Sequence, residues 1–109
     1  MRIAIIGGAG FVGTRLVSRM KMSNFEYSIF DINSSKLLEN ITHLNVEDPK
    51  SLENIKGANS IINLAAVHRD DVLPLSRYDD VNVQGAVNVC EAARKYGIDK
   101  IVFTSSVAI

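Results

Sequence analysis

Three glycines near the start of the chain are spaced to bind a phosphate. Gly7, Gly10 and Gly13 follow the apolar run 3–6 and lead into a helical stretch predicted over 11–22. Between a strand and a helix, Gly7 allows a tight turn, Gly10 a close approach of a pyrophosphate, and Gly13 a helix lying close to the sheet. The helix dipole and its free N–H groups would attract the phosphates. The spacing predicts a dinucleotide-binding turn; a glycine-rich turn without a ligand is the alternative.

An acidic residue ends the second predicted strand, where a nucleotide ribose would lie. Asp31, eighteen positions after Gly13, can accept hydrogen bonds from ribose hydroxyls and would repel a 2′-phosphate. NAD is therefore favoured over NADP, although Lys36 and the pair 34–35 keep NADP open. The alternative role for Asp31 is to start a turn.

Short apolar runs alternate with helical patterns along the whole chain, as in a parallel sheet covered by crossover helices. The right-handed crossover rule predicts a Rossmann-like, doubly wound α/β fold with helices on both faces, strand order 3-2-1-4-5, and ligands at the carboxyl edge. The five strands are predicted near Arg2–Ile6, Tyr27–Asp31, Ile41–Val46, Ser60–Ala65 and Lys100–Ser105.

Helices are predicted between these strands. The first has Val12, Leu16 and Met20 one turn apart, so that this face can pack on the sheet. A second, of about two turns, would begin with Asp48 as N-cap and Pro49 as its first residue, and would stop at Gly57.

The last predicted helix, 77–96, has two faces that can pack. One face would cover the sheet, and the other is expected to meet either a second subunit, in a homodimer, or another part of the same chain. The two sets are Val83, Val87, Cys90 and Arg94 on one face, and Gly85, Val89, Ala92 and Tyr96 on the other.

Composition limits the classes of function. The 109 residues are enough for one domain, 1–109, and 47% are hydrophobic. A net charge of zero gives no reason to expect nucleic acid or an anionic membrane as partner, so a small molecule is expected. One cysteine and two histidines predict no disulfide and no metal cluster, which fits the reducing cytoplasm. No segment approaches the ~20 apolar residues of a membrane helix.

In their order and spacing, several short motifs resemble the extended short-chain dehydrogenase/reductase family, specifically its NAD-dependent nucleotide-sugar epimerases and dehydratases. The likeness runs from end to end of the chain. It rests on GGAGFVG at 7–13, Phe30-Asp31-Ile32-Asn33, Leu64-Ala65-Ala66, Asn82-Val83-Gln84-Gly85, Glu91-Ala92-Ala93-Arg94 and Thr104-Ser105-Ser106.

The resemblance implies a role for each matching position. The backbone of Phe11 and Val12 would meet the pyrophosphate, and Ser106 would hydrogen-bond the reacting hydroxyl of the substrate. The remaining expected contacts are Asp31, Ile32 and Asn33 at the adenosine ribose, Asn45 and Val46 at the adenine, Leu64, Ala65 and Ala66 along the dinucleotide channel, His68 near the nicotinamide ribose, and Asn82 in ordering the site.

Two positions depart from the family pattern. Ile6 stands where a threonine is usual, which removes a hydroxyl that could brace the glycine turn. Asn45 stands where an acid that contacts adenine is usual, and its amide can still pair with the base. Both departures predict a weaker or altered affinity for the cofactor. The first also resembles distant members that bind a dinucleotide without catalysis.

The catalytic pair of the family is expected to lie outside this sequence. That pair is a tyrosine and a lysine one helical turn apart, placed after the serine strand, with the lysine lowering the tyrosine pKa. Tyr96 and Lys100 have the spacing, but Gly97 between them predicts a helix stop and Lys100 begins a strand. The chain is therefore expected to be an amino-terminal fragment that lacks the Tyr-Lys helix and the sugar-binding region and is inactive alone.

The function implied by the resemblance is 4-epimerisation of a UDP-sugar by the parent protein, through transient hydride transfer to NAD. A dehydratase reaction remains open within the same family. The alternative from a different class is a non-catalytic dinucleotide-binding module or sensor.

Overall fold

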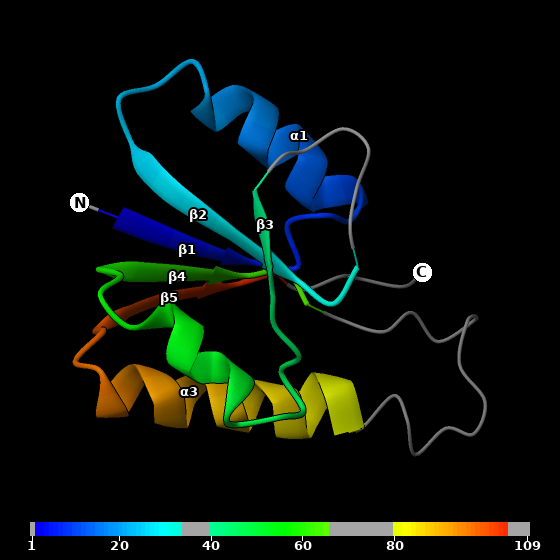
Figure 1. The fold of residues 1–109 in the computed structure, drawn as a ribbon, viewed down its shortest axis with the longest axis vertical. Helices are drawn as coiled ribbons and strands as arrows, with labels where there is room; N and C mark the ends of the chain where they lie inside the picture. The colour runs from blue at the N-terminus through cyan, green and yellow to red at the C-terminus, as the bar shows by residue number, and fades with distance from the viewer. Residues whose placement is uncertain (1, 34–39, 66–79, 105–109) are drawn as a thin grey trace.

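The chain folds as a five-stranded parallel sheet between helices. The computed structural model describes residues 2–33, 40–65 and 80–104. All four strand pairs are parallel and the spatial order is β3-β2-β1-β4-β5, which confirms the predicted order (Figure 1). The strands are β1 (Arg2–Ile6), β2 (Glu26–Asp31), β3 (Ile41–His43), β4 (Ser60–Asn63) and β5 (Lys100–Phe103).

Helices cover the sheet on both sides. Helix α1 (Phe11–Met20) lies against one face, and α3 (Gly85–Lys95) lies against the other, as Figure 1 shows. One turn of π-helix, η3 (Asp80–Gln84), leads into α3, and the 3₁₀ helix η1 (Ser51–Ile55) packs beside α3. The two faces of the sheet therefore belong to two separate hydrophobic cores.

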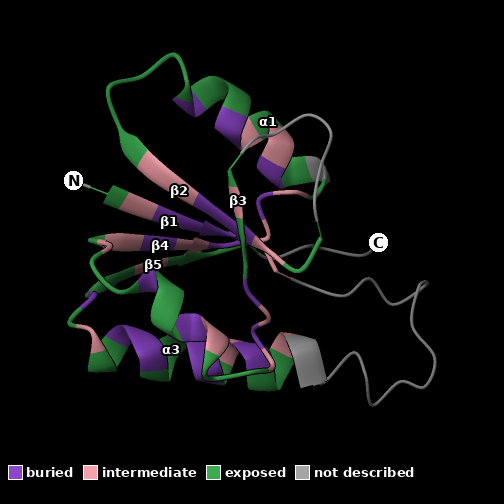
Figure 2. Ribbon diagram, viewed as in Figure 1, coloured by how far each residue is buried: buried purple, intermediate pink, exposed green. Residues whose placement is uncertain are grey.

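The central strand β1 supplies both cores. Ala4 and Ile6 face the core on the α3 side, whereas Ile5 faces the core on the α1 side, and each is at most 1% exposed. Successive side chains of a strand point to opposite faces, so burial of consecutive residues indicates a strand covered on both sides. Figure 2 shows this burial along the centre of the sheet.

Helix α1 buries a different stripe from the one predicted. Gly13, Val17 and Met20 are buried, whereas Val12 is 55% exposed. The buried positions follow the i, i+4, i+7 spacing of a helix face. The first of them, Gly13, packs against Gly8 of the glycine turn. The prediction from Val12, Leu16 and Met20 was therefore wrong by about one position at the amino end, although Leu16 does pack on the core.

Side-chain amides end two of the strands earlier than predicted. Asn45 Oδ1 accepts the Glu47 N–H (3.0 Å), and Asn63 Oδ1 accepts the Ala65 N–H (3.1 Å). These hydrogen bonds turn the backbone away from the ladder. As a result β3 ends at His43 rather than at 46, and β4 ends at Asn63 rather than at 65.

The helices also differ from their predicted bounds. Asp48 Oδ1 accepts the Lys50 N–H (3.1 Å), and the chain then forms a 3₁₀ helix from Ser51 rather than two turns of α-helix after Pro49. Gly57 does provide the stop, at φ +94°. Helix α1 ends at Met20, two residues early, and the predicted start of the last helix at 77 lies outside the described residues.

The two faces of α3 are confirmed. The face containing Gly85, Val89 and Ala92 is buried in the core on that side of the sheet. On the other face Val83 is 60% and Val87 43% exposed, and Cys90 is exposed. Whether a second subunit or another part of the same chain covers that face stays a prediction.

Candidate dinucleotide site

The glycine turn joins β1 to α1 at the carboxyl edge of the sheet. Gly7 has φ +82°, a conformation that L side chains rarely adopt, and a Cβ there would lie 2.7 Å from the Ala65 backbone nitrogen. A Cβ at Gly13 would lie 2.5 Å from the Gly8 Cα. Gly13 therefore lets α1 lie close to the turn itself. The sequence had predicted that Gly13 brings the helix close to the sheet.

The turn is fastened to the end of β2. The N–H groups of Gly7 and Gly8 both donate to the Phe30 carbonyl oxygen, at 2.7 and 3.3 Å. The Ala9 N–H donates to Asp31 Oδ2 at 2.9 Å. Sequence reasoning missed Gly8 and the Phe30 carbonyl. The available signal in the sequence was the pair Gly7-Gly8. In the structure a Cβ at Gly8 would lie 2.5 Å from the Ile29 side chain, so this position also requires glycine.

The amino end of α1 is open to an anion. Its N-cap is Gly10, which makes no side-chain capping bond, and the first turn holds no acidic residue. The N–H groups of the first three helical residues, 11–13, have no acceptor within the helix. A Cβ at Gly10 would meet only the Gly7 carbonyl oxygen at 3.5 Å, an ordinary contact, so folding does not require glycine there. These features suit a phosphate.

Asp31 lies beside this helix end. Its Oδ2 accepts from Ala9, and its Oδ1 accepts the Asn33 N–H (3.0 Å). Asp31 is half-buried, whereas Ile32 and Asn33 are exposed. Each carboxylate oxygen can accept more than one hydrogen bond, so ribose hydroxyls can bind without displacing either N–H. The Asp31 carboxylate thus braces the turn at the carboxyl end of β2.

The carboxyl ends of β3 and β4 lie on either side of this centre. The Leu44 N–H donates to the Asp31 carbonyl oxygen (3.0 Å), which brings half-buried Asn45 and buried Val46 next to β2. On the other side, the Leu64 N–H donates to the Ile6 carbonyl oxygen (2.7 Å), and half-buried Leu64 and Ala65 lie against Gly7. The winding of the sheet reverses between β1 and β4, where such folds bind ligands.

The remaining predicted residues are further away or not described. Asn82 is half-buried in η3, the turn of π-helix that leads into α3. Ala66, His68 and Ser106 lie outside the described residues. Ile6, which stands where the family usually has a threonine, is 1% exposed in the α3-side core. The turn is held instead by the Phe30 carbonyl oxygen and the Asp31 carboxylate.

Tyr96 and Lys100 do not share a helix face, as predicted. Helix α3 ends at Lys95, Gly97 has φ +70°, and Lys100 is the first residue of β5. The Tyr-x-x-x-Lys match within this chain is therefore no acid–base pair.

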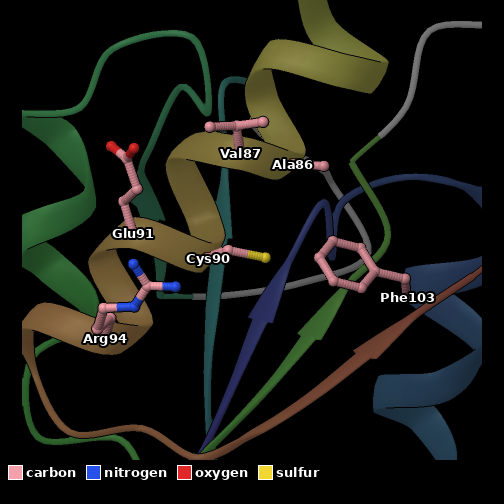
Figure 3. Close-up of a pocket in the computed structure, with 6 residues that line it drawn as sticks. All are labelled: Ala86, Val87, Cys90, Glu91, Arg94 and Phe103. Carbon is pink, nitrogen blue, oxygen red and sulfur yellow. The ribbon is translucent and has the colours of Figure 1, made fainter.

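A hollow of ≈390 Å³ lies on the uncovered face of α3, away from the glycine turn. Figure 3 shows Cys90 of α3 directed toward Phe103 of β5 across it. The hollow is lined by Ala86, Val87, Cys90, Glu91, Arg94 and Phe103. It extends the exposed face of α3 and holds none of the residues predicted to bind a dinucleotide.

The described ranges 2–33, 40–65 and 80–104 hold neither a metal-binding cluster nor a membrane-spanning helix. Within them, no group of three or more histidine, cysteine or acidic side chains could hold a metal ion. The helices in these same ranges include none with the length and apolar character needed to cross a membrane.

Comparison with known proteins decides the family. Residues 3–109 match the NAD dependent epimerase/dehydratase family. The chain belongs to this family. An Escherichia coli O157:H7 relative named N-acetyl-alpha-D-glucosaminyl-diphospho-ditrans,octacis-undecaprenol 4-epimerase is 43% identical over 109 residues, 98% of this chain and 33% of the relative. A relative from Methanocaldococcus jannaschii, named a putative UDP-glucose 4-epimerase, is 35% identical over 95% of this chain and 37% of its own length.

Solved structures agree. The Thermus thermophilus UDP-glucose 4-epimerase complex with NAD superposes with a TM-score of 0.85 at 25% identity, covering 97% of this chain and 38% of that one. A short-chain dehydrogenase/reductase superfamily protein from Agrobacterium tumefaciens with bound NAD gives 0.87 at 27% identity, covering 97% and 33%. This family member thus spans about a third of the length of the relatives it matches.

The contacts of the turn predict which glycine folding requires. In Gly13→Ala the new Cβ would meet the Gly8 backbone, which cannot move without breaking the turn, so the free energy of unfolding should fall by about 1–3 kcal/mol. Gly10→Ala should change it by less than about 1 kcal/mol, because its Cβ has room. Urea unfolding of both variants of the complete protein measures the difference. Equal stabilities would contradict the tight contact.

Proposed function

We propose that this chain is the NAD-binding part of a sugar 4-epimerase whose substrate is a sugar carried on a diphosphate. The observation that carries the proposal is the pairing of Asp31 Oδ2 with the Ala9 N–H beside the open amino end of α1. This pairing puts the proposed ribose acceptor beside the proposed phosphate site. Membership of an NAD-dependent family supplies the identity of the dinucleotide.

The residues of the chain divide the dinucleotide among them. The backbone N–H groups of Phe11 and Val12 bind the pyrophosphate at the helix end. Asp31 accepts from the adenosine ribose hydroxyls, with Ile32 and Asn33 alongside. Gly10 keeps the backbone near the phosphates free of a side chain, and Gly7 and Gly13 allow the turn itself to form.

The other predicted contacts extend the site in both directions. Asn45 and Val46 receive the adenine beyond β2, and Leu64, Ala65 and Ala66 line the channel toward the nicotinamide. Asn82 helps to order the site, and His68 approaches the nicotinamide ribose. These assignments rest on the family pattern together with the strand order that puts β3 and β4 on opposite sides of the turn.

Ser106 is the one candidate catalytic residue in this sequence. It would donate to or accept from the sugar hydroxyl and hold it in line for proton transfer. Bound NAD would supply reversible hydride transfer at the sugar carbon. Tyr96 and Lys100 do not form the acid–base pair, which the family pattern puts after the serine strand.

Two carriers of the sugar are consistent with the relatives. The Escherichia coli relative is named for a sugar diphosphate on undecaprenol, and relatives from Methanocaldococcus jannaschii and Bacillus subtilis are named, the former putatively, for UDP-glucose. Both carriers present a sugar diphosphate ester. A UDP-sugar is the first substrate to test, and the undecaprenyl-linked sugar is favoured as the second by the 43% identity.

The reaction is tested with the complete protein and each of four substrates: UDP-glucose, UDP-N-acetylglucosamine and the two corresponding sugars on an undecaprenyl diphosphate. The expected result is interconversion at carbon 4 of one carrier class, followed by proton NMR, with no net reduction of NAD. Net reduction of NAD or loss of water would identify a dehydrogenase or a dehydratase instead. Binding of NAD without turnover of any sugar would contradict the epimerase proposal.

The role of Asp31 predicts a defined loss of binding. Asp31→Ala removes a charge-assisted acceptor for the ribose and the brace of the Ala9 N–H, so NAD binding should weaken by about 1–3 kcal/mol, roughly 5- to 150-fold in Kd. Asp99→Ala is the control, because it removes an equal charge from an exposed residue at the opposite edge of the sheet. Calorimetric titration of both variants measures Kd. If Asp31→Ala binds as tightly as Asp99→Ala, Asp31 is not in the site.

A further inference from the structure

The loop after β3 lies directly beside the residue proposed to hold the adenosine ribose. His43 pairs with Asp31 in the parallel ladder, and the next N–H, from Leu44, donates to the Asp31 carbonyl oxygen at 3.0 Å. Asn45 is therefore the first residue past the ladder at the carboxyl edge. A base attached to a ribose on Asp31 can reach it.

The backbone of Asn45 is held by one serine. The Asn45 N–H donates to Ser51 Oγ at 3.0 Å. The Ser51 hydroxyl in turn lies 2.7 Å from the Asn45 carbonyl oxygen and 2.9 Å from that of Asp48, and either can accept its proton. The first residue of η1 thus closes the loop onto itself.

A buried amide on α3 holds the next residue. Asn88 Nδ2 donates to the Val46 carbonyl oxygen at 2.9 Å, and Asn88 is only 6% exposed. Gln84 Nε2 donates to Asn88 Oδ1 at 3.1 Å, which fixes the orientation of the Asn88 amide. Leu44 and Val46 are both buried in the core on that side. The loop is therefore fixed on two sides of Asn45.

The orientation of the Asn45 side chain follows from its own hydrogen bond. Its Oδ1 accepts the Glu47 N–H at 3.0 Å, and only an oxygen can accept from an N–H there. The Nδ2 donor is consequently the end of the amide turned away from the loop. An aspartate at this position would keep the same bond to Glu47 but would present a second acceptor in place of the donor.

Adenine and hypoxanthine, two purines that differ at carbon 6, distinguish a donor at position 45 from an acceptor. Adenine has an amino donor there, and hypoxanthine has a carbonyl acceptor. We infer that Asn45 determines base specificity at this site and lets it bind nicotinamide hypoxanthine dinucleotide as well as NAD. This inference rests on the proposed function, which puts the adenosine ribose on Asp31. Adenine can still accept from Nδ2 through a ring nitrogen, so NAD binding is retained.

The test compares the two dinucleotides on the complete protein and its Asn45→Asp variant by calorimetric titration. The carboxylate repels the hypoxanthine carbonyl and accepts from the adenine amine. The ratio of the Kd for nicotinamide hypoxanthine dinucleotide to the Kd for NAD should therefore rise about tenfold or more. Asn45→Ala, which has neither group, should give an intermediate ratio. Asn24→Asp, the same charge change on an exposed turn, should leave the ratio unchanged.

The outcomes separate the two proposals. NAD binding with a ratio that Asn45→Asp does not raise overturns the inference and leaves the proposed function standing. Failure of the unchanged protein to bind either dinucleotide overturns both. Thermal unfolding of each variant tests whether the loop is retained. If only Asn45→Asp loses stability, the Asn45→Ala variant decides. Its loss of the Nδ2 donor must then raise the ratio of the Kd for nicotinamide hypoxanthine dinucleotide to the Kd for NAD above that of the unchanged protein.

Discussion

The docking of the glycine turn onto the end of β2 is the constraint on which the site depends. Three successive N–H groups, from Gly7, Gly8 and Ala9, are taken by the Phe30 carbonyl oxygen and by Asp31 Oδ2. The donors that remain for a ligand are those of the first turn of α1. The same contact brings the Asp31 carboxylate next to them, so the proposed phosphate and ribose contacts have one structural cause.

In the proposed site, three kinds of group would recognise the three parts of the dinucleotide. The phosphates would meet backbone N–H groups, which almost any sequence could supply once the turn has formed. The ribose would meet the Asp31 carboxylate, which also holds the turn through the Ala9 N–H, so its replacement should weaken both binding and the turn. The base would meet the side chain of Asn45, whose partner in the loop, the Glu47 N–H, can donate equally well to an aspartate carboxylate. Base specificity can therefore change with the least disturbance of the fold.

The strand order could be predicted because the apolar runs and the glycine spacing are local patterns, to which the right-handed crossover rule then applies. It did not predict where β3 and β4 end, because the amides of Asn45 and Asn63 turn the chain while it still reads as apolar. It also placed the close contact of Gly13 on the sheet, whereas Gly8 is the neighbour, a distinction that only tertiary packing makes. The binding and catalytic roles of the predicted site residues, from Asp31 and Asn45 to Ser106, all stay predictions.

The central claim is that Asp31 makes this a site for NAD, and calorimetric titration of the complete, folded protein with NAD and NADP tests it most directly. The carboxylate accepts from a free 2′-hydroxyl and repels a 2′-phosphate, so NAD should bind at least about tenfold more tightly. Equal affinity for the two, a preference for NADP, or no binding of NAD would contradict the account.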